Sequence, residues 1–179
     1  MTASRLIVLV CVLIMCWFLS HQAGRLDRLH HRVETTRAAL DTHLARRAEI
    51  CIDISHCAGL DQTISAMMAK AARGSLAGTD QGLDDRANAE NILSQALHVA
   101  FDSTGDVRKY REDAVLKGLL NELVAESKRV QLSRRFHAEA VGACKHVRRQ
   151  RLVRLFHLAG HAALPGTFDF MDELPDPLA

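Results

Sequence analysis

Histidine and cysteine are the residues of this chain whose side chains could bind a metal ion. The chain has ten histidines and five cysteines. His157 and His161 are four residues apart, so on a helix they would share one face, a spacing that two metal ligands can use. No Asp, Glu or Cys lies at a third helical position nearby, and Cys51 and Cys57 have no second cysteine pair to complete a zinc site. We therefore expect no bound metal and no cofactor.

Sequence motifs for catalysis do not occur in the chain. There is no Gly-x-Ser-x-Gly, no P-loop and no Gly-x-Gly-x-x-Gly. A general base would need a nucleophile or a paired acid beside it. A pocket that joined His137 to Glu139 or Asp113 would raise an enzymatic alternative, although no spacing requires one. The sequence predicts a protein that is not an enzyme.

Basic residues gather between positions 128 and 154, where nine Lys or Arg stand against one acid, Glu139. This excess indicates either a solvated helix face or a surface for an acidic partner, such as a protein, an anionic membrane leaflet or the chain's own acidic tail. The net charge of +2 and the few aromatic residues argue against nucleic acid. The candidate contact residues are Arg134, Arg135, Lys145, Arg148, Arg149, Arg151 and Arg154.

The N-terminus carries an unbroken apolar run from Leu6 to Leu19. With its flanking residues the run reaches the ~20 residues that a membrane-spanning helix needs, so residues 1–24 are predicted to be a transmembrane anchor. A cleaved signal peptide is the alternative, but His21 stands where a small residue would be needed before a cut at Ala23. More basic residues follow the run than precede it, which places residues 25–179 in the cytoplasm and the N-terminus outside the plasma membrane.

The elements that position these residues are predicted to be helices. The three prolines all lie in the last fifteen residues, and no alternating strand pattern follows residue 24. Apolar residues at helical spacing predict a long helix from residue 26 that continues through Gly59, a second helix over residues 84–101, and a third that starts near Val107 or Glu112 and ends at Arg149. A short fourth helix is expected over residues 152–159. The stripe of the first helix consists of Leu26, Leu29, Val33, Leu40, Leu44, Cys51 and Ile54.

These stripes predict an all-α fold, in which the transmembrane helix continues into an antiparallel up-and-down bundle of three long helices and a short fourth. The bundle spans residues 25–160, and an acidic, proline-containing tail occupies residues 161–179. With three helices, the third would run parallel to the first, and its basic end would lie far from the membrane. That geometry favours the acidic tail over lipid as the partner of the basic residues.

Three sequence blocks follow the apolar run in order. They are Arg28-Leu29 to Arg46-Arg47-Ala48, Arg135-Phe136-His137-Ala138-Glu139-Ala140-Val141, and Leu164-Pro165-Gly166-Thr167-Phe168-Asp169-Phe170. These blocks, in this order behind an N-terminal anchor, resemble the LemA family of bacterial membrane proteins, and the match is moderately specific. The sequence departs from the family pattern at residues 49–54, where Leu-Ile-Pro-Asn-Leu is usual, and at Phe136-His137, where the family has Tyr-Asn. The resemblance implies a single span and a cytoplasmic helical bundle, and no established activity.

The sequence as a whole predicts a single-pass membrane protein with a non-catalytic cytoplasmic domain. The expected role is that of a scaffold or adaptor for partner proteins at the membrane, with a homo-oligomer possible. The alternative is an exported or outward-facing helical bundle involved in envelope interactions. Neither version requires a cofactor or nucleic acid.

Overall fold

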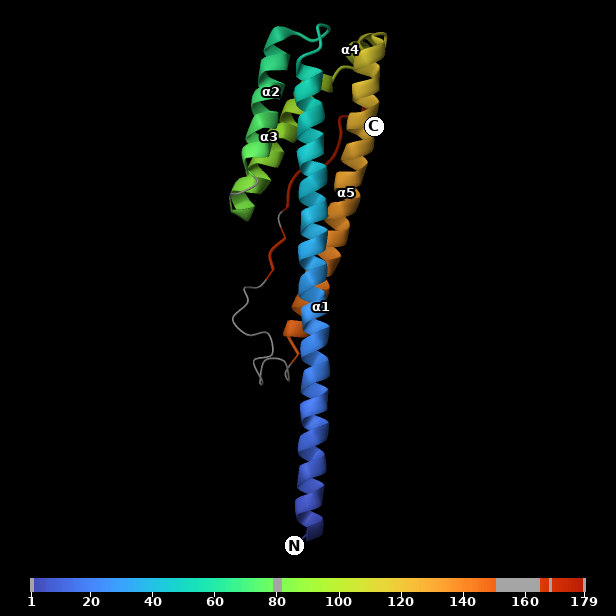
Figure 1. Ribbon diagram of the computed structural model, residues 1–179. Helices are drawn as coiled ribbons and strands as arrows, with labels where there is room; N and C mark the ends of the chain where they lie inside the picture. Colours follow the sequence, from blue (N-terminus) through green and yellow to red (C-terminus); the bar gives the residue numbers. More distant parts are fainter. Residues whose placement is uncertain (1, 79–81, 151–164, 168, 179) are drawn as a thin grey trace. The chain divides into compact units, whose positions relative to one another are not determined.

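The computed structural model describes residues 2–78, 82–150, 165–167 and 169–178, and within them the chain forms five helices and no strand. This confirms the all-α class and the helical bundle. The predicted short helix over residues 152–159 lies outside the described residues. The helices are α1 (Thr2–Ser55), α2 (Gln62–Ala77), α3 (Leu83–Phe101), α4 (Thr104–Tyr110) and α5 (Ala114–Arg148) (Figure 1).

The chain divides into two compact units, each assembled from separate stretches of sequence. Unit 1 comprises Met1–Thr36 and Ala138–Pro165, and unit 2 comprises Arg37–His137 and Gly166–Ala179. Because α1 and α5 are continuous across this division, each unit contains a segment of both helices.

Unit 2 is an up-and-down bundle. α2 runs back along its segment of α1, α3 returns, and α5 runs back again (Figure 1). The antiparallel register of α1 and α5 is fixed by two pairs, because His43 meets Glu126 and, three residues later, Arg46 meets Glu122. The main core lies between these helices. Its largest side chains are Ile50, Ile54, Met68, Leu93, Leu97, Phe101, Leu116, Leu120 and Leu123.

The α1–α2 boundary corrects the prediction of one long helix through Gly59. α1 ends at Ser55, and α2 begins at Gln62. The carboxylate of Asp61 accepts hydrogen bonds from the backbone N–H groups of Thr63 (2.8 Å) and Ile64 (3.3 Å), so Asp61 is the N-cap of α2. These bonds lower the pKa of Asp61 below its ordinary value. Gly59 alone was not expected to end the helix. Together with the N-cap Asp61 it separates α1 from α2.

The third predicted helix is also divided, into α4 and α5. Residues 111–113 separate the two helices, and the Asp113 carboxylate caps α5 by accepting hydrogen bonds from the N–H groups of Val115 (2.8 Å) and Leu116 (2.9 Å). Of the two predicted starts, the later one at Glu112 lies next to the observed start. The bundle therefore has four long helices and a short α4, rather than three long helices.

The C-terminal segment packs into unit 2 as an extended strap over α3 and α5. Phe170 is buried with Leu40, Leu44 and Val130, and Leu178 is buried in the main core. The strap is tied by polar contacts as well. Ser94 Oγ donates to the carbonyl of Met171 (2.6 Å), Asn91 Oδ1 accepts from the Met171 N–H (2.7 Å), and Gln131 Nε2 donates to the carbonyl of Asp172 (2.8 Å).

Unit 1 contains a pair of antiparallel helix segments and the apolar N-terminal part of α1. Its described core is small, consisting of Leu26, Val33, Ala140, Val141, Cys144 and Val147. The end of α5 therefore lies beside the stretch of α1 that follows the apolar run (Figure 1). This corrects the prediction that the last long helix runs parallel to the first.

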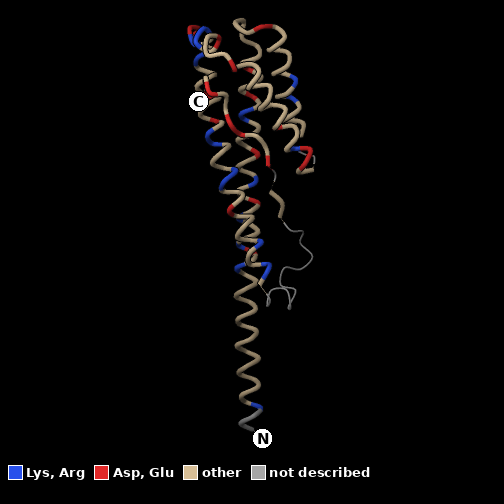
Figure 2. Tube along the Cα trace, turned by 180° about the vertical axis from the view of Figure 1, so that it is seen from behind, with Lys and Arg blue, Asp and Glu red and all other residues tan. Residues whose placement is uncertain are grey.

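The apolar run of α1 is exposed along its length within the structure. The stretch from Leu6 to Trp17 presents large apolar side chains to the surroundings, and by length and composition α1 can cross a membrane. The sequence has no charged residue from Leu6 to Leu19, and Figure 2 shows charges of both signs on the part of the chain that follows. The helix is therefore compatible with a single-pass membrane anchor.

Candidate partner-binding groove

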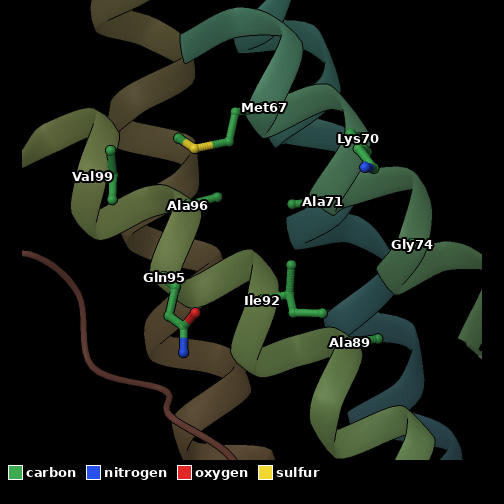
Figure 3. Close-up of a pocket in the computed structure, with 9 residues that line it drawn as sticks. All are labelled: Met67, Lys70, Ala71, Gly74, Ala89, Ile92, Gln95, Ala96 and Val99. Carbon is green, nitrogen blue, oxygen red and sulfur yellow. The ribbon is translucent and has the colours of Figure 1, made fainter. Parts of the chain in front are cut away.

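An open groove lies between α2 and α3 in unit 2. Its volume is about 510 Å³, within the range of ~300–1,000 Å³ that is usual for ligand sites. Figure 3 shows residues from both helices pointing towards the space between them. The groove is lined by Met67, Lys70, Ala71, Gly74, Ala89, Ile92, Gln95, Ala96 and Val99.

The sequence of each helix explains why a groove forms there. Small residues (Ala71 and Gly74 on α2, Ala89 and Ala96 on α3) leave the space between the two helices unfilled, and a Cβ added at Gly74 would meet no atom within 4 Å. The longer side chains of Met67, Ile92 and Val99 then form the walls.

The walls of the groove expose apolar surface. Ile92 is 48% exposed and Val99 63% exposed. The apolar pattern of the predicted helix over residues 84–101 places Ile92 on the same side as Leu93 and Phe101, and the exposure of Ile92 corrects this part of the prediction. The buried face of α3 is instead formed by Leu93, Leu97 and Phe101. An exposed apolar groove is the kind of surface into which an amphipathic helix of another protein lays its apolar face.

A buried polar network fixes the position of α2 and α3 against α1. The Glu90 carboxylate of α3 is fully buried, and it accepts hydrogen bonds from Arg47 Nη2 of α1 (2.8 Å) and from Ser75 Oγ of α2 (2.6 Å). Arg86 Nε lies 3.5 Å from the same carboxylate, and Arg86 Nη1 donates to the backbone carbonyl of Ser75 (2.9 Å). One carboxylate thereby joins three helices.

This network holds the two helices that line the groove. Ser75 follows the groove residue Gly74, and Glu90 follows the groove residue Ala89. A buried ion pair adds little net stability, but removing one partner costs about 3–5 kcal/mol because a charge is left uncompensated. The network therefore holds α2 and α3 at a fixed distance from each other, and it does so on the side that faces away from the groove.

The predicted basic residues divide between the two units, with Arg134 and Arg135 in unit 2 and the later ones in unit 1. Arg134 pairs with the acidic strap, since its guanidinium lies 2.7 Å from Asp169 and 2.8 Å from Asp172 and stacks 5.7 Å over the Phe170 ring. The predicted contact with the acidic tail is therefore observed at Arg134. Arg135 and Arg149 are exposed, and Lys145 and Arg148 are half-buried at the end of α5. Arg151 and Arg154 lie outside the described residues.

The structure does not bring together the groups considered for catalysis. His137 is buried and Glu139 is exposed, while Asp113 caps the far end of α5. Asp113 and His137 are therefore separated by about 36 Å of helix at 1.5 Å per residue. Burial raises the pKa of the Cys51 thiol to about 12, which disfavours the reactive thiolate. Among the described residues, no three His, Cys, Asp or Glu are grouped so that they could hold a metal ion. His157 and His161 are not among them.

Sequence reasoning missed both the groove and the network, each for its own reason. Charged residues are usually at the surface, so Arg47 and Glu90 gave no indication of burial. A signal was present in the helical register, because Glu90, Leu93 and Leu97 share the i, i+3, i+7 face that is buried. The groove depends on which faces of α2 and α3 oppose each other, and the sequence of one helix alone does not show this.

The comparisons with known proteins give no independent identification. No family model, no curated protein and no solved structure matches this chain. The resemblance to the LemA family therefore stays a prediction.

Proposed function

We propose that the protein is a membrane-tethered adaptor, and that its α2–α3 groove binds an amphipathic helix of a partner protein. The observation that carries the proposal is the groove itself, an apolar hollow on a domain whose N-terminal helix is long and apolar enough to cross a membrane. In this proposal the N-terminal helix spans the plasma membrane with its N-terminus outside, and residues 25–179 are in the cytoplasm. The protein requires no cofactor for this role.

The chemistry of the groove defines the partner helix. Small residues on the floor allow close approach of another helix, and the flexible Met67 side chain adapts to its shape. Lys70 is the only charged residue among the lining residues, and Arg73 is exposed one turn along α2. The matching partner helix therefore has apolar anchors at i, i+3 or i+4, and i+7, and an acidic residue at the edge that faces Lys70.

The groove is tested by photo-crosslinking in native membranes. A photoreactive amino acid replaces Ile92 in the full chain, and the matched control replaces Leu132, which is equally exposed (51%) on α5 outside the groove. The expected result is a crosslink from position 92, absent from position 132, that maps to an amphipathic acidic helix of one partner. A crosslink from position 92 to a second copy of this chain would instead show a homo-oligomer and overturn the proposal.

Binding of the crosslinked segment is then measured with a synthetic peptide and the full chain in detergent. Val99→Asp is expected to weaken binding about ten-fold or more, because a charge would have to enter an apolar contact. Leu132→Asp is the control and leaves the affinity unchanged. Lys70→Glu weakens binding as well, and a peptide whose acidic residue is replaced by Lys recovers affinity for this variant. If Val99→Asp and Lys70→Glu bind as tightly as the wild type, the groove is not the site.

The proposed topology is tested by protease protection on intact cells. A C-terminal tag is expected to survive external protease until the membrane is opened, and the N-terminal segment is expected to remain in the mature chain. Digestion of the tag from outside, or loss of the N-terminus, would favour the exported bundle.

A further inference from the structure

The end of α5 lies level with the first basic turns of α1 after the apolar run. Val147 of α5 is buried in the same cluster as Leu26 of α1. Five basic residues flank these two positions, and they are called the basic collar here. The collar consists of Arg25, Arg28, Lys145, Arg148 and Arg149.

The collar follows the apolar run by a short length of helix. Leu19 ends the run, and Arg25 and Arg28 lie about 9 and 14 Å further along the helix axis at 1.5 Å per residue. The headgroup region of a bilayer adds about 5–8 Å to each side of the hydrocarbon core, and charges act over a Debye length of about 8 Å at physiological salt. Since residues 20–24 also extend the span, the collar lies at the level of the lipid headgroups.

The charge of the collar is strongly one-sided. Asp27 is the acidic residue at this level of α1, and α5 carries no acid between Glu139 and its end at Arg148. Arg25, Arg28 and Arg149 are exposed. With the proposed anchor in a membrane, α1, the end of α5 and the following Arg149 place five cations and one carboxylate at the membrane surface.

We propose that the basic collar binds the headgroups of anionic phospholipids. This inference rests on the proposed membrane anchor, and it adds a lipid class to it. α1 alone would bring two of the cations to the membrane, and the antiparallel return of α5 brings the other three. Each Lys or Arg held near an anionic surface strengthens the interaction about five-fold.

The test measures which lipids surround the full-length protein. The protein is reconstituted into bilayers of phosphatidylcholine with phosphatidylglycerol, and spin-labelled lipids report the relative association of each class. The wild-type protein is expected to enrich phosphatidylglycerol several-fold, and added salt is expected to reduce the enrichment. The triple variant Lys145→Gln, Arg148→Gln, Arg149→Gln is expected to lose most of it.

Two controls separate a specific collar from net charge and from damage to the fold. The variant Arg108→Gln, Lys109→Gln, Lys117→Gln removes three exposed cations from unit 2 and keeps the enrichment. The variant Lys145→Arg, Arg148→Lys, Arg149→Lys keeps the charge and also keeps the enrichment. Equal enrichment in wild-type protein and the Gln triple variant would overturn the role of α5. A protein that does not insert into the bilayer at all would instead refute the proposed anchor.

Discussion

The two units use the same two helices, but among the described residues their cores differ greatly in size. In unit 1 the α1 and α5 segments bury six described residues, of which only Leu26 is large and most are Val, Ala or Cys. In unit 2 the same helices are joined by α2, α3, α4 and the strap, and they bury a core of Leu, Ile, Met and Phe. Because stability grows with the apolar area removed from water, the same pair of helices is expected to be held weakly in unit 1 and firmly in unit 2.

The two cores also differ in whether they bury charged residues. Unit 2 buries Arg47, Arg86 and Glu90 in one network, whereas the described core of unit 1 is apolar. Unit 2 is therefore sensitive to the loss of single polar groups. Unit 1 is expected to unfold locally while the rest of the chain stays folded. Its stability is expected to change only with substitutions that alter apolar packing.

The largest effect is expected for Glu90→Gln. This change leaves the guanidinium groups of Arg47 and Arg86 without their buried carboxylate, so the free energy of unfolding should fall by about 3–5 kcal/mol. Urea unfolding of the full chain in detergent, followed by circular dichroism, measures it. Glu122→Gln, which alters a half-exposed pair on the same bundle, is the control and should leave the urea midpoint unchanged. Equal midpoints for Glu90→Gln and the wild type would show that the network does not hold unit 2.

A pair of core truncations compares the two units directly. Leu120→Ala in unit 2 removes a fully buried side chain and should cost about 2–5 kcal/mol, whereas Val141→Ala in unit 1 should cost about 1.5 kcal/mol. Hydrogen exchange shows where each loss acts. Val141→Ala should speed exchange in residues 138–148 and leave residues 114–130 protected. If it speeds exchange equally in both, the two units open together and the comparison between them fails.

The sequence predicted the parts of this fold that depend on one helix at a time. Leu26, Val33 and Leu40 recur every seven residues, and Leu44 lies one turn further along the same stripe. All four are buried, as expected for a stripe on a single helix that must face some partner. The direction of the last long helix was predicted wrongly because it depends on the number of turns before it. The unrecognised break between Ser55 and Gln62 adds one reversal, so α5 runs antiparallel to α1 instead of parallel.

That single reversal also decided where the candidate sites are. The predicted topology had placed Lys145 and Arg149 far from the membrane. The reversal returns this end of α5 to the level of Leu26. It creates α2 as a separate helix, and the groove exists only because α2 and α3 lie side by side. Asp61 was the residue that could have indicated the break, because Asp followed by a helical pattern is typical of an N-cap.

Glycine-to-alanine substitutions in α5 are expected to stabilise the protein, by less than the core truncations destabilise it. Gly118 lies in unit 2 and Gly142 in unit 1, and a Cβ added at either position would meet no atom within 4 Å. Replacement by Ala should therefore stabilise the helix by about 0.5–1 kcal/mol. Gly142→Ala is expected to slow hydrogen exchange mainly in residues 138–148. Slower exchange in residues 114–130 for Gly142→Ala would show that the helix responds as one unit.

The mildest test alters no residue and compares two buried thiols, Cys51 in unit 2 and Cys144 in unit 1. Burial raises the pKa of both, for Cys51 to about 12, and so lowers the fraction of each folded thiol that is present as the thiolate, the form that reacts with an alkylating reagent. Labelling of either thiol therefore requires local opening of its unit. The protection of a thiol whose pKa is raised by burial is complete below the ordinary thiol pKa, and it is lost as the pH rises towards the pKa of the thiol in the folded state. Because unit 1 has the smaller core, mass spectrometry should find Cys144 labelled well before Cys51. Labelling of Cys51 first, or of both at one rate, would show that unit 1 is not the weaker of the two.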